Sequence, residues 1–84
     1  MELIYKKTYS EHYDLEAVIE RCYDSFPEEW GELEDNEIEK DSHVSGIYEA
    51  TDVMANGLKI KVEIYHSDDA EEEDTWVCAA YKIS

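Results

Sequence analysis

The distribution of acidic residues most limits what this chain can fold into. Its 84 residues include 23 Asp and Glu against 7 Lys and Arg, which gives a formal net charge of −16. Residues 28–41 contain eight carboxylates and one lysine, and six of the seven residues from 68 to 74 are acidic. Because charged side chains are almost never fully buried unless they are paired, we expect both segments at the surface. The hydrophobic core then has to come from the rest of the chain.

Composition separates this chain from acidic disordered segments, which are poor in aromatic residues and rich in Pro, Ser and Gly. The chain has seven Tyr, two Trp and one Phe, with only three Gly and one Pro. Its hydrophobic fraction of 43% is close to that of ordinary globular domains. A chain of this length can hold one lean core. We therefore expect residues 1–84 to form a single acidic globular domain.

Residues 15–26 show the clearest helical pattern. Apolar side chains recur at intervals of three and four and so share one face, at Leu15, Val18, Ile19, Cys22 and Phe26. Ser10 or Asp14 can cap the start of this helix.

A second, short helix is expected to begin near Ser25. Ser25 and Glu28 have the spacing of a capping box, and Pro27 is tolerated in a first helical turn. Trp30 and Leu33, three residues apart, would then point the same way, and the helix would end in the polar run 34–37.

Later segments alternate with a period of two, which is typical of half-buried strands. Residues 44–54 and 58–65 flank Asn56-Gly57, the strongest hairpin signal in the chain. Residues 75–83 are apolar enough for a central strand, and residues 3–9 give a weaker first strand. The predicted fold is α+β, with one or two N-terminal helices packed on an antiparallel sheet of three or four strands and an acidic loop at 68–74.

Two cysteines bear on the compartment. Cys22 and Cys78 lie far apart without metal-type spacing, whereas a secreted domain this small usually carries several disulfides. We expect both to be reduced, buried thiols. The first residues lack the apolar run of a signal peptide, and no stretch approaches transmembrane length. The predicted location is the cytoplasm, that of a bacterial host cell if the chain is phage-encoded.

The sequence offers little for catalysis or metal binding. Its three histidines lie in unrelated segments, and no nucleophile motif surrounds a serine. Residues 68–74 lack the alternate ligand spacing and the turn glycine of calcium loops. We expect neither an enzyme nor a metal or cofactor site. Direct nucleic-acid binding is disfavoured, because phosphate contacts depend on Lys and Arg.

The inverse relationship to nucleic acid is physically reasonable. A folded surface whose carboxylates are spaced like backbone phosphates can occupy the DNA-binding groove of a basic protein, with fast electrostatic steering and added apolar contacts. Trp30 and Leu33 fit that pattern, because they lie inside an acidic rim formed by Glu28, Glu29, Glu32 and Glu34. The alternative is that Trp30 and Leu33 face the core.

Residues 26–33 (FPEEWGEL) resemble a family motif, the Leu-Pro-Glu-Glu-hydrophobic-x-Glu-hydrophobic helix start of the small phage inhibitors of uracil-DNA glycosylase. These inhibitors are acidic DNA mimics with helices packed on an antiparallel sheet. The similarity continues without a gap to Tyr48-Glu49. Further on, Ser67-Asp68 resembles a Ser-Asp loop and Trp76-Val77 resembles a Trp-hydrophobic strand start.

The resemblance implies roles for individual residues. Glu29 and Glu32 would contact the enzyme from the helix, and Asp68 would contact it from a loop. Trp30, Leu33 and Val44 would line a pocket that receives the hydrophobic side chain with which the enzyme intercalates into DNA.

The sequence therefore predicts a non-enzymatic, DNA-mimicking inhibitor that blocks the basic groove of a DNA-acting enzyme. Uracil-DNA glycosylase is the leading candidate target, and a CRISPR effector or restriction enzyme is the alternative within this class. The expected partner is a basic DNA-binding protein, with no membrane contact, and the choice between monomer and dimer stays open. The expected partner-binding residues are Glu28, Glu29, Trp30, Glu32, Leu33, Glu34, Asp35, Val44, Asp68, Asp69, Glu71 and Glu72.

Two further classes of function fit the charge. An immunity protein that neutralises a basic toxin nuclease is one, and residues 27–32 resemble the Pro-Glu-x-aromatic-Gly-Glu stretch of barstar-like inhibitors. The hairpin at Asn56-Gly57 does not suit that parallel α/β fold. An acidic subunit or adaptor, whose charge serves solubility and assembly, is the other.

Overall fold

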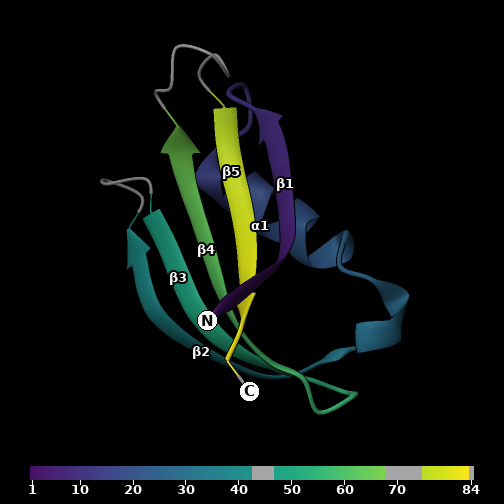
Figure 1. Cartoon of the computed structure of the whole chain (residues 1–84). Coiled ribbons are helices and arrows are strands. Elements are labelled where there is room, and N and C mark those ends of the chain that lie inside the picture. The colour runs from purple at the N-terminus through teal and green to yellow at the C-terminus, as the bar shows by residue number, and fades with distance from the viewer. Residues whose placement is uncertain (43–46, 68–74, 84) are drawn as a thin grey trace.

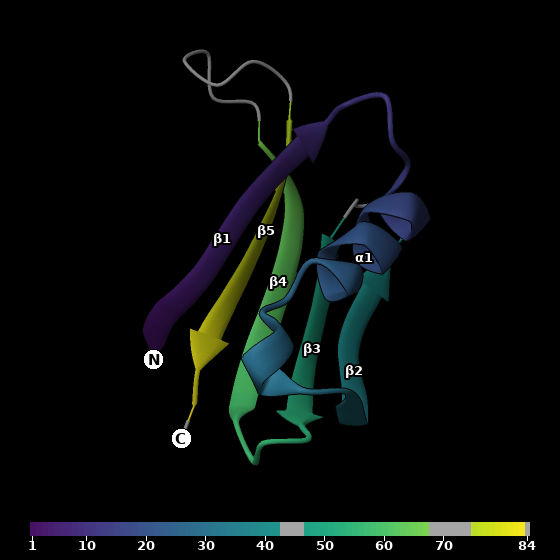
Figure 2. The same ribbon diagram turned by 90° about the vertical axis from the view of Figure 1, so that its right-hand side faces the viewer.

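The computed structural model of this chain describes residues 1–42, 47–67 and 75–83. Residues 41, 42 and 67 are described by their backbone only. Within these residues, five antiparallel strands form one sheet and a single α-helix lies against one of its faces (Figures 1 and 2). The strand order is β1-β5-β4-β3-β2, so β1 and β2 are the two edges. The elements are β1 (Glu2–Ser10), α1 (Leu15–Asp24), the 3₁₀ turn η1 (Glu28–Trp30), β2 (Leu33–Ser42), β3 (Ile47–Met54), β4 (Lys59–Ser67) and β5 (Thr75–Lys82).

The predicted architecture of three or four strands with one or two helices is therefore wrong. The second helix is only the 3₁₀ turn η1, and the polar run expected to follow it belongs to the edge strand β2. Two irregularities explain why the sequence pattern does not predict β2. Its pairing with β3 shifts register between Leu33 and Asp35 and again between Ile38 and Lys40. These shifts break the period of two, and Asp and Glu are depleted in strands.

The helix α1 forms where its apolar spacing predicts it. The Asp14 carboxylate caps it by accepting a hydrogen bond from the Ala17 amide at 2.8 Å. Leu15, Val18 and Cys22 are buried on one face. Ser25 is not the start of a further helix; it ends α1, and its hydroxyl donates to the Cys22 carbonyl at 2.8 Å.

The core is a single layer between α1 and the face of the sheet that it covers. Strands β3 and β4 alternate between buried and partly exposed positions over most of their length, as a half-buried sheet requires. Val18 and Cys22 of α1 are fully buried in this layer, together with Trp30 of η1. The strand residues of the layer are Tyr48, Ala50, Met54, Ile60, Val62, Ile64, Trp76, Cys78 and Ala80.

The last strand, β5, is an interior strand, as its apolar sequence predicts. It pairs with β1 on one side and with β4 on the other. Val77 and Ala79 point away from α1 and yet are only 2% exposed. Both are flanked by a strand on each side, β1 and β4, and β5 is apolar at buried positions that face both ways.

A close approach between η1 and the β3–β4 turn sets the path into β2. Gly31 has φ +75°, and a Cβ there would lie 2.7 Å from the Cβ of Ala55, so only glycine fits. The Trp30 carbonyl accepts a hydrogen bond from the Asn56 amide at 3.2 Å, and the Glu32 carbonyl accepts one from the Ala55 amide at 2.8 Å. These contacts fix Trp30 in the core and start β2 at the sheet edge.

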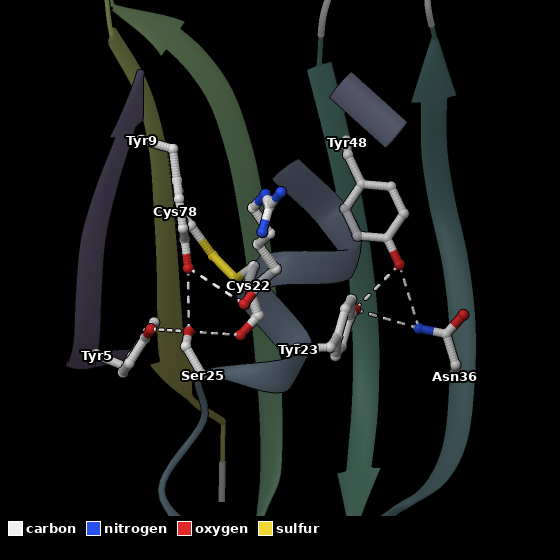
Figure 3. The surroundings of a disulfide bond; sticks show 9 residues. Tyr5, Tyr9, Cys22, Tyr23, Ser25, Asn36, Tyr48 and Cys78 are labelled. Atoms are coloured by element: carbon white, nitrogen blue, oxygen red, sulfur yellow. Dashed lines mark hydrogen bonds between the residues drawn. A yellow bond between two sulfur atoms is a disulfide. The ribbon is translucent and has the colours of Figure 1, made fainter. Parts of the chain in front are cut away.

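A disulfide joins Cys22 of α1 to Cys78 of β5 (Figure 3). The prediction of two reduced thiols is therefore wrong. The two Cα atoms lie 6.4 Å apart, although 56 positions separate the residues in the sequence. Sequence spacing carries no signal for this pair, because the cysteines meet only when the helix packs on the sheet. The bond fastens the helix to an interior strand.

No helix in the described part of the chain combines the length and the apolar character needed to cross a membrane.

Reduction of this disulfide should lower the stability of the domain. In the loop-entropy picture a crosslink of this span contributes about 4 kcal/mol, and measured disulfides typically contribute about 2–4 kcal/mol. We expect the free energy of unfolding in urea to fall by about 2–4 kcal/mol when a phosphine reductant is added. The double variant Cys22→Ala/Cys78→Ala should not respond to the reductant. Two free thiols titrated in the denatured, unreduced protein would contradict the assignment.

Candidate functional site

A cleft of about 320 Å³ opens between α1 and the edge strand β2. Helical spacing brings Glu16, Ile19 and Tyr23 to the side of α1 that faces β2. The lining residues from the sheet are Leu33, Asn36, Ile38 and Tyr48. Figure 2 shows α1 in front of β3 and beside β2, which is the last strand on that side of the sheet.

The walls of this cleft expose large apolar side chains. Leu33 is 44% exposed and Ile38 is 52% exposed, and both stand on an edge strand that is otherwise strongly polar. Ile19 of α1 is partly buried opposite them. Large apolar side chains gathered and exposed in this way are typical of an interaction site.

Two tyrosines and an asparagine form a polar group at the cleft. The hydroxyls of Tyr23 and Tyr48 lie 3.0 Å apart, and the Asn36 amide nitrogen donates to the Tyr48 oxygen at 3.3 Å (Figure 3). The same nitrogen donates to the buried carboxylate of Asp52 on β3. Burial raises the pKa of Tyr23 well above its ordinary value, with the hydrogen bond to Asp52 adding to the effect. Its hydroxyl therefore stays protonated.

Asp52 is a fully buried carboxyl behind this polar group. It points into the core side of β3, at a position that otherwise carries apolar residues. Its Oδ2 atom has no hydrogen-bond partner among the residues that the structure describes. Burial raises the pKa of Asp52, while hydrogen bonds from Tyr23 and Asn36 lower it and the Asp35 charge raises it; the net direction is upward.

Acidic side chains are concentrated on η1, β2 and α1, although Glu16 is the one acidic residue in the lining of the cleft. Asp35 and Glu37 of β2 pair with Val53 and Thr51, which face away from α1. Residues 28–39 of η1 and β2 contain seven carboxylates and no Lys or Arg, and all seven are exposed; we call this segment the acidic surface. Glu16 and Glu20, one turn apart, add exposed carboxylates on α1. Lys61 Nζ lies 3.6 Å from Glu39 Oε2, and this is the one ion pair within the described ranges. The Thr51 hydroxyl and then Lys61 lower the pKa of Glu39.

The opposite side of α1 differs in charge. A second cavity, of about 410 Å³, lies between α1 and β1 and is lined by Lys7 and Arg21 together with Asp24. The Arg21 guanidinium sits 4.4 Å from the centre of the Tyr13 ring. Among the described residues, charge therefore differs between the two sides of α1, with Lys7 and Arg21 on the side of β1 and the carboxylates of β2 on the other.

The structure sorts the predicted site residues into three groups. Glu28, Glu29, Glu32, Glu34 and Asp35 are exposed on η1 and β2, and Leu33 lines the cleft.

Trp30 is only 6% exposed and packs against Phe26, so it belongs to the core, as the alternative prediction has it, and not to an exposed apolar spot. Its side chain is drawn inward because η1 is held against the β3–β4 turn. The remaining predicted residues, Val44, Asp68, Asp69, Glu71 and Glu72, lie outside the described residues.

Sequence reasoning misses much of the cleft. The sequence pattern places Ile19 and Tyr23 simply on a helix, and Asn36 in a polar run. Two signals point further: Ile38 is the one apolar residue between Glu34 and Asp41, and Asp52 interrupts the inward-facing alternation of β3. The sequence does not predict that α1 lies beside β2, because its pattern assigns the first residues of β2 to the end of a helix.

Within residues 1–42, 47–67 and 75–83, no group of three or more His, Cys, Asp or Glu side chains is arranged to hold a metal ion. Comparison with known proteins gives no match to any protein-family model, any curated protein or any solved structure.

Replacing Asp52 by Asn should stabilise the domain at neutral pH. Because folding raises the Asp52 pKa above its unfolded value of about 3.8, the folded state binds this proton more tightly than the unfolded state does. The wild type therefore loses stability as pH rises through the folded pKa, by about 1.4 kcal/mol for each tenfold difference in proton affinity between the two states. Asn keeps an acceptor for Asn36 without the charge.

This pH dependence is measured as the difference in unfolding free energy between Asp52→Asn and the wild type from pH 4 to pH 7. We expect the difference to grow in favour of the variant as pH rises. A difference that stays constant or shrinks toward pH 7 would show that the carboxylate of Asp52 is not destabilised by burial.

Proposed function

We propose that this chain is a DNA-mimicking protein inhibitor that binds and blocks the basic nucleic-acid-binding groove of a DNA-acting enzyme. The observation that carries the proposal is the acidic surface beside an open apolar cleft. Six of its seven carboxylates form no ion pair with a residue that the structure describes. They are available to a partner rather than consumed within the domain.

Protection of a free sheet edge does not account for this surface. Charged side chains on an edge strand discourage pairing with another chain. A few charges and the two register shifts of β2 already serve that purpose. Further acidic residues raise the self-repulsion of a domain with net charge −16. An interaction with a positively charged partner offsets that repulsion, and it also explains why apolar side chains are left exposed among the acids.

The proposed mechanism is occlusion without catalysis. Long-range attraction brings the acidic surface to a basic groove, and this steering weakens as salt screens it. The exposed side chains of Leu33 and Ile38 then add contacts that DNA does not offer. Neither a cofactor nor direct contact with nucleic acid or a membrane is part of the proposal.

The target within this class is proposed on the resemblance alone. Uracil-DNA glycosylase is the leading candidate, because residues 26–33 resemble the motif of its phage inhibitors. The pocket implied by that resemblance does not carry the proposal, since Trp30 is in the core. The interaction is proposed at the α1–β2 cleft instead. A CRISPR effector, a restriction enzyme and a basic toxin nuclease belong in the same test.

We place the action of the protein in the cytoplasm, because the proposed target enzymes act on intracellular DNA. Because Cys22 and Cys78 form a disulfide, reduced thiols no longer support a cytoplasmic location. The disulfide is compatible with this location because both sulfurs are fully buried, and thiol–disulfide exchange depends on access to the sulfur.

Charge reversal on β2 should impair inhibition. We expect Glu34→Lys/Glu37→Lys to weaken inhibition by at least about tenfold at low salt, because steering and complementarity are both lost. Wild-type inhibition should itself weaken as salt is raised from about 50 to 500 mM, over which the screening length shortens severalfold. The assays are uracil excision, guided DNA cleavage, restriction and toxin-nuclease cleavage, each with purified enzyme.

The matched control is Glu2→Lys/Glu11→Lys, which makes the same change in net charge at exposed positions on or beside β1, the opposite edge. This control should leave inhibition nearly unchanged. Equal loss in both double variants would mean that only total charge matters, and inhibition of no enzyme in the panel would contradict the proposed function.

A further inference from the structure

We propose further that the α1–β2 cleft receives a lysine side chain of the partner protein. This assignment rests on the proposed function, since it names the partner group that enters the site. It departs from the hydrophobic side chain that the family resemblance implies. The shape of the cleft, its hydrogen-bonding atoms and a buried charge behind it each support the assignment.

The walls of the cleft suit the aliphatic part of a lysine. Ile19 on one side and Leu33 and Ile38 on the other offer apolar surface to a chain of four methylene groups. Lysine side chains commonly bury their methylenes along such surfaces while the ammonium stays at a polar end. The volume of about 320 Å³ is ample for one side chain of this size.

The polar end of the cleft presents acceptors. The Asn36 amide nitrogen is directed to Asp52 and the tyrosine oxygens, and Figure 3 shows its carbonyl oxygen pointing away from both hydroxyls. The Tyr48 oxygen, which accepts from the Asn36 nitrogen, carries a further lone pair. An ammonium group has three donors and no acceptor, so it matches this set. The Glu16 carboxylate, at the helix side of the lining, adds negative charge.

The buried carboxyl of Asp52 gives separate support for a cation at this end of the cleft. Its carboxyl is fully buried and its Oδ2 is unpartnered among the described residues. A buried carboxylate without a counter-charge is costly. A cation bound at the Asn36 carbonyl would lie next to the side chain whose amide nitrogen donates to Asp52, and would offset that cost. Asp52 acts here as a positioning residue, because its bond with the Asn36 nitrogen turns the Asn36 carbonyl outward.

Other occupants fit less well. An apolar side chain would cover the Asn36 carbonyl and the tyrosine oxygens without replacing their bonds to water, which is unfavourable for buried polar groups. Arginine presents a planar fork that suits paired carboxylate oxygens, whereas these acceptors are single and come from different side chains. Anions are disfavoured by the net charge of −16.

The test is an NMR titration of ¹⁵N- and methyl-labelled protein with three short probes, Ac-Ala-Lys-Ala-NH₂ and its norleucine and arginine counterparts. We expect saturable shifts at the Asn36 side-chain amide and at the Ile19 and Ile38 methyls. The lysine peptide should bind about tenfold more tightly than the norleucine peptide, a factor equivalent to about 1.4 kcal/mol. It should also bind more tightly than the arginine peptide.

Matched variants separate this cleft from general attraction to an acidic protein. Glu16→Gln and Glu63→Gln each remove one carboxylate, but Glu63 lies on β4 at a position facing away from α1. We expect Glu16→Gln to weaken binding of the lysine peptide severalfold and Glu63→Gln to leave it unchanged. Tyr48→Phe and Asn36→Leu each remove acceptors at the polar end and should reduce the preference for lysine over norleucine.

Three outcomes would overturn the assignment. One is equal or tighter binding of norleucine or arginine, another is the absence of saturable shifts at the cleft, and the third is equal weakening by both Gln variants. Each would leave the inhibition assays untouched, so the proposed function would stand. Conversely, if the protein binds the lysine peptide selectively but inhibits no enzyme in the panel, the lysine site is supported and the proposed inhibitor function is contradicted.

Discussion

The packing of α1 against one face of the sheet is the interaction on which the rest of this structure depends. Val18 and Cys22 bury the helix in the core, and the Cys22–Cys78 bond fastens it to the interior strand β5. A small domain has little apolar surface to bury, so a crosslink between its two layers contributes a large share of stability. Because α1 is also one wall of the cleft, the geometry of the candidate site depends on the same contact.

This arrangement explains how the chain tolerates a net charge of −16. With one face of the sheet as the core, many of the described acids lie on the edge strand β2, on η1 and on the outer side of α1, and others lie on the outer face of the sheet. Among the described carboxyl groups, Asp52 is the fully buried one. It adjoins the polar end of the cleft, and an interior group that lowers stability is understandable where it orients side chains for binding.

Periodicity predicts the parts of the fold that follow one regular pattern. The helix from Leu15, the β3–β4 hairpin and the apolar strand β5 are all predicted correctly, because burial on a fixed face leaves a period in the sequence. The strand β2 is missed because it is an edge strand with two register shifts and mostly charged side chains. The disulfide and the cleft are missed for a common reason. Each brings together residues that are distant in sequence, and which residues meet depends on the order of the strands in the sheet.

The most direct test of this account is amide hydrogen exchange of the protein alone and in complex with an enzyme that it inhibits. If the partner binds the acidic surface and the cleft, exchange should slow in β2 and along α1 on complex formation. Exchange in β1, at the opposite edge of the sheet, should be unchanged. Protection of β1 with no change in β2 and α1 would contradict the central claim that the acidic edge is the binding surface.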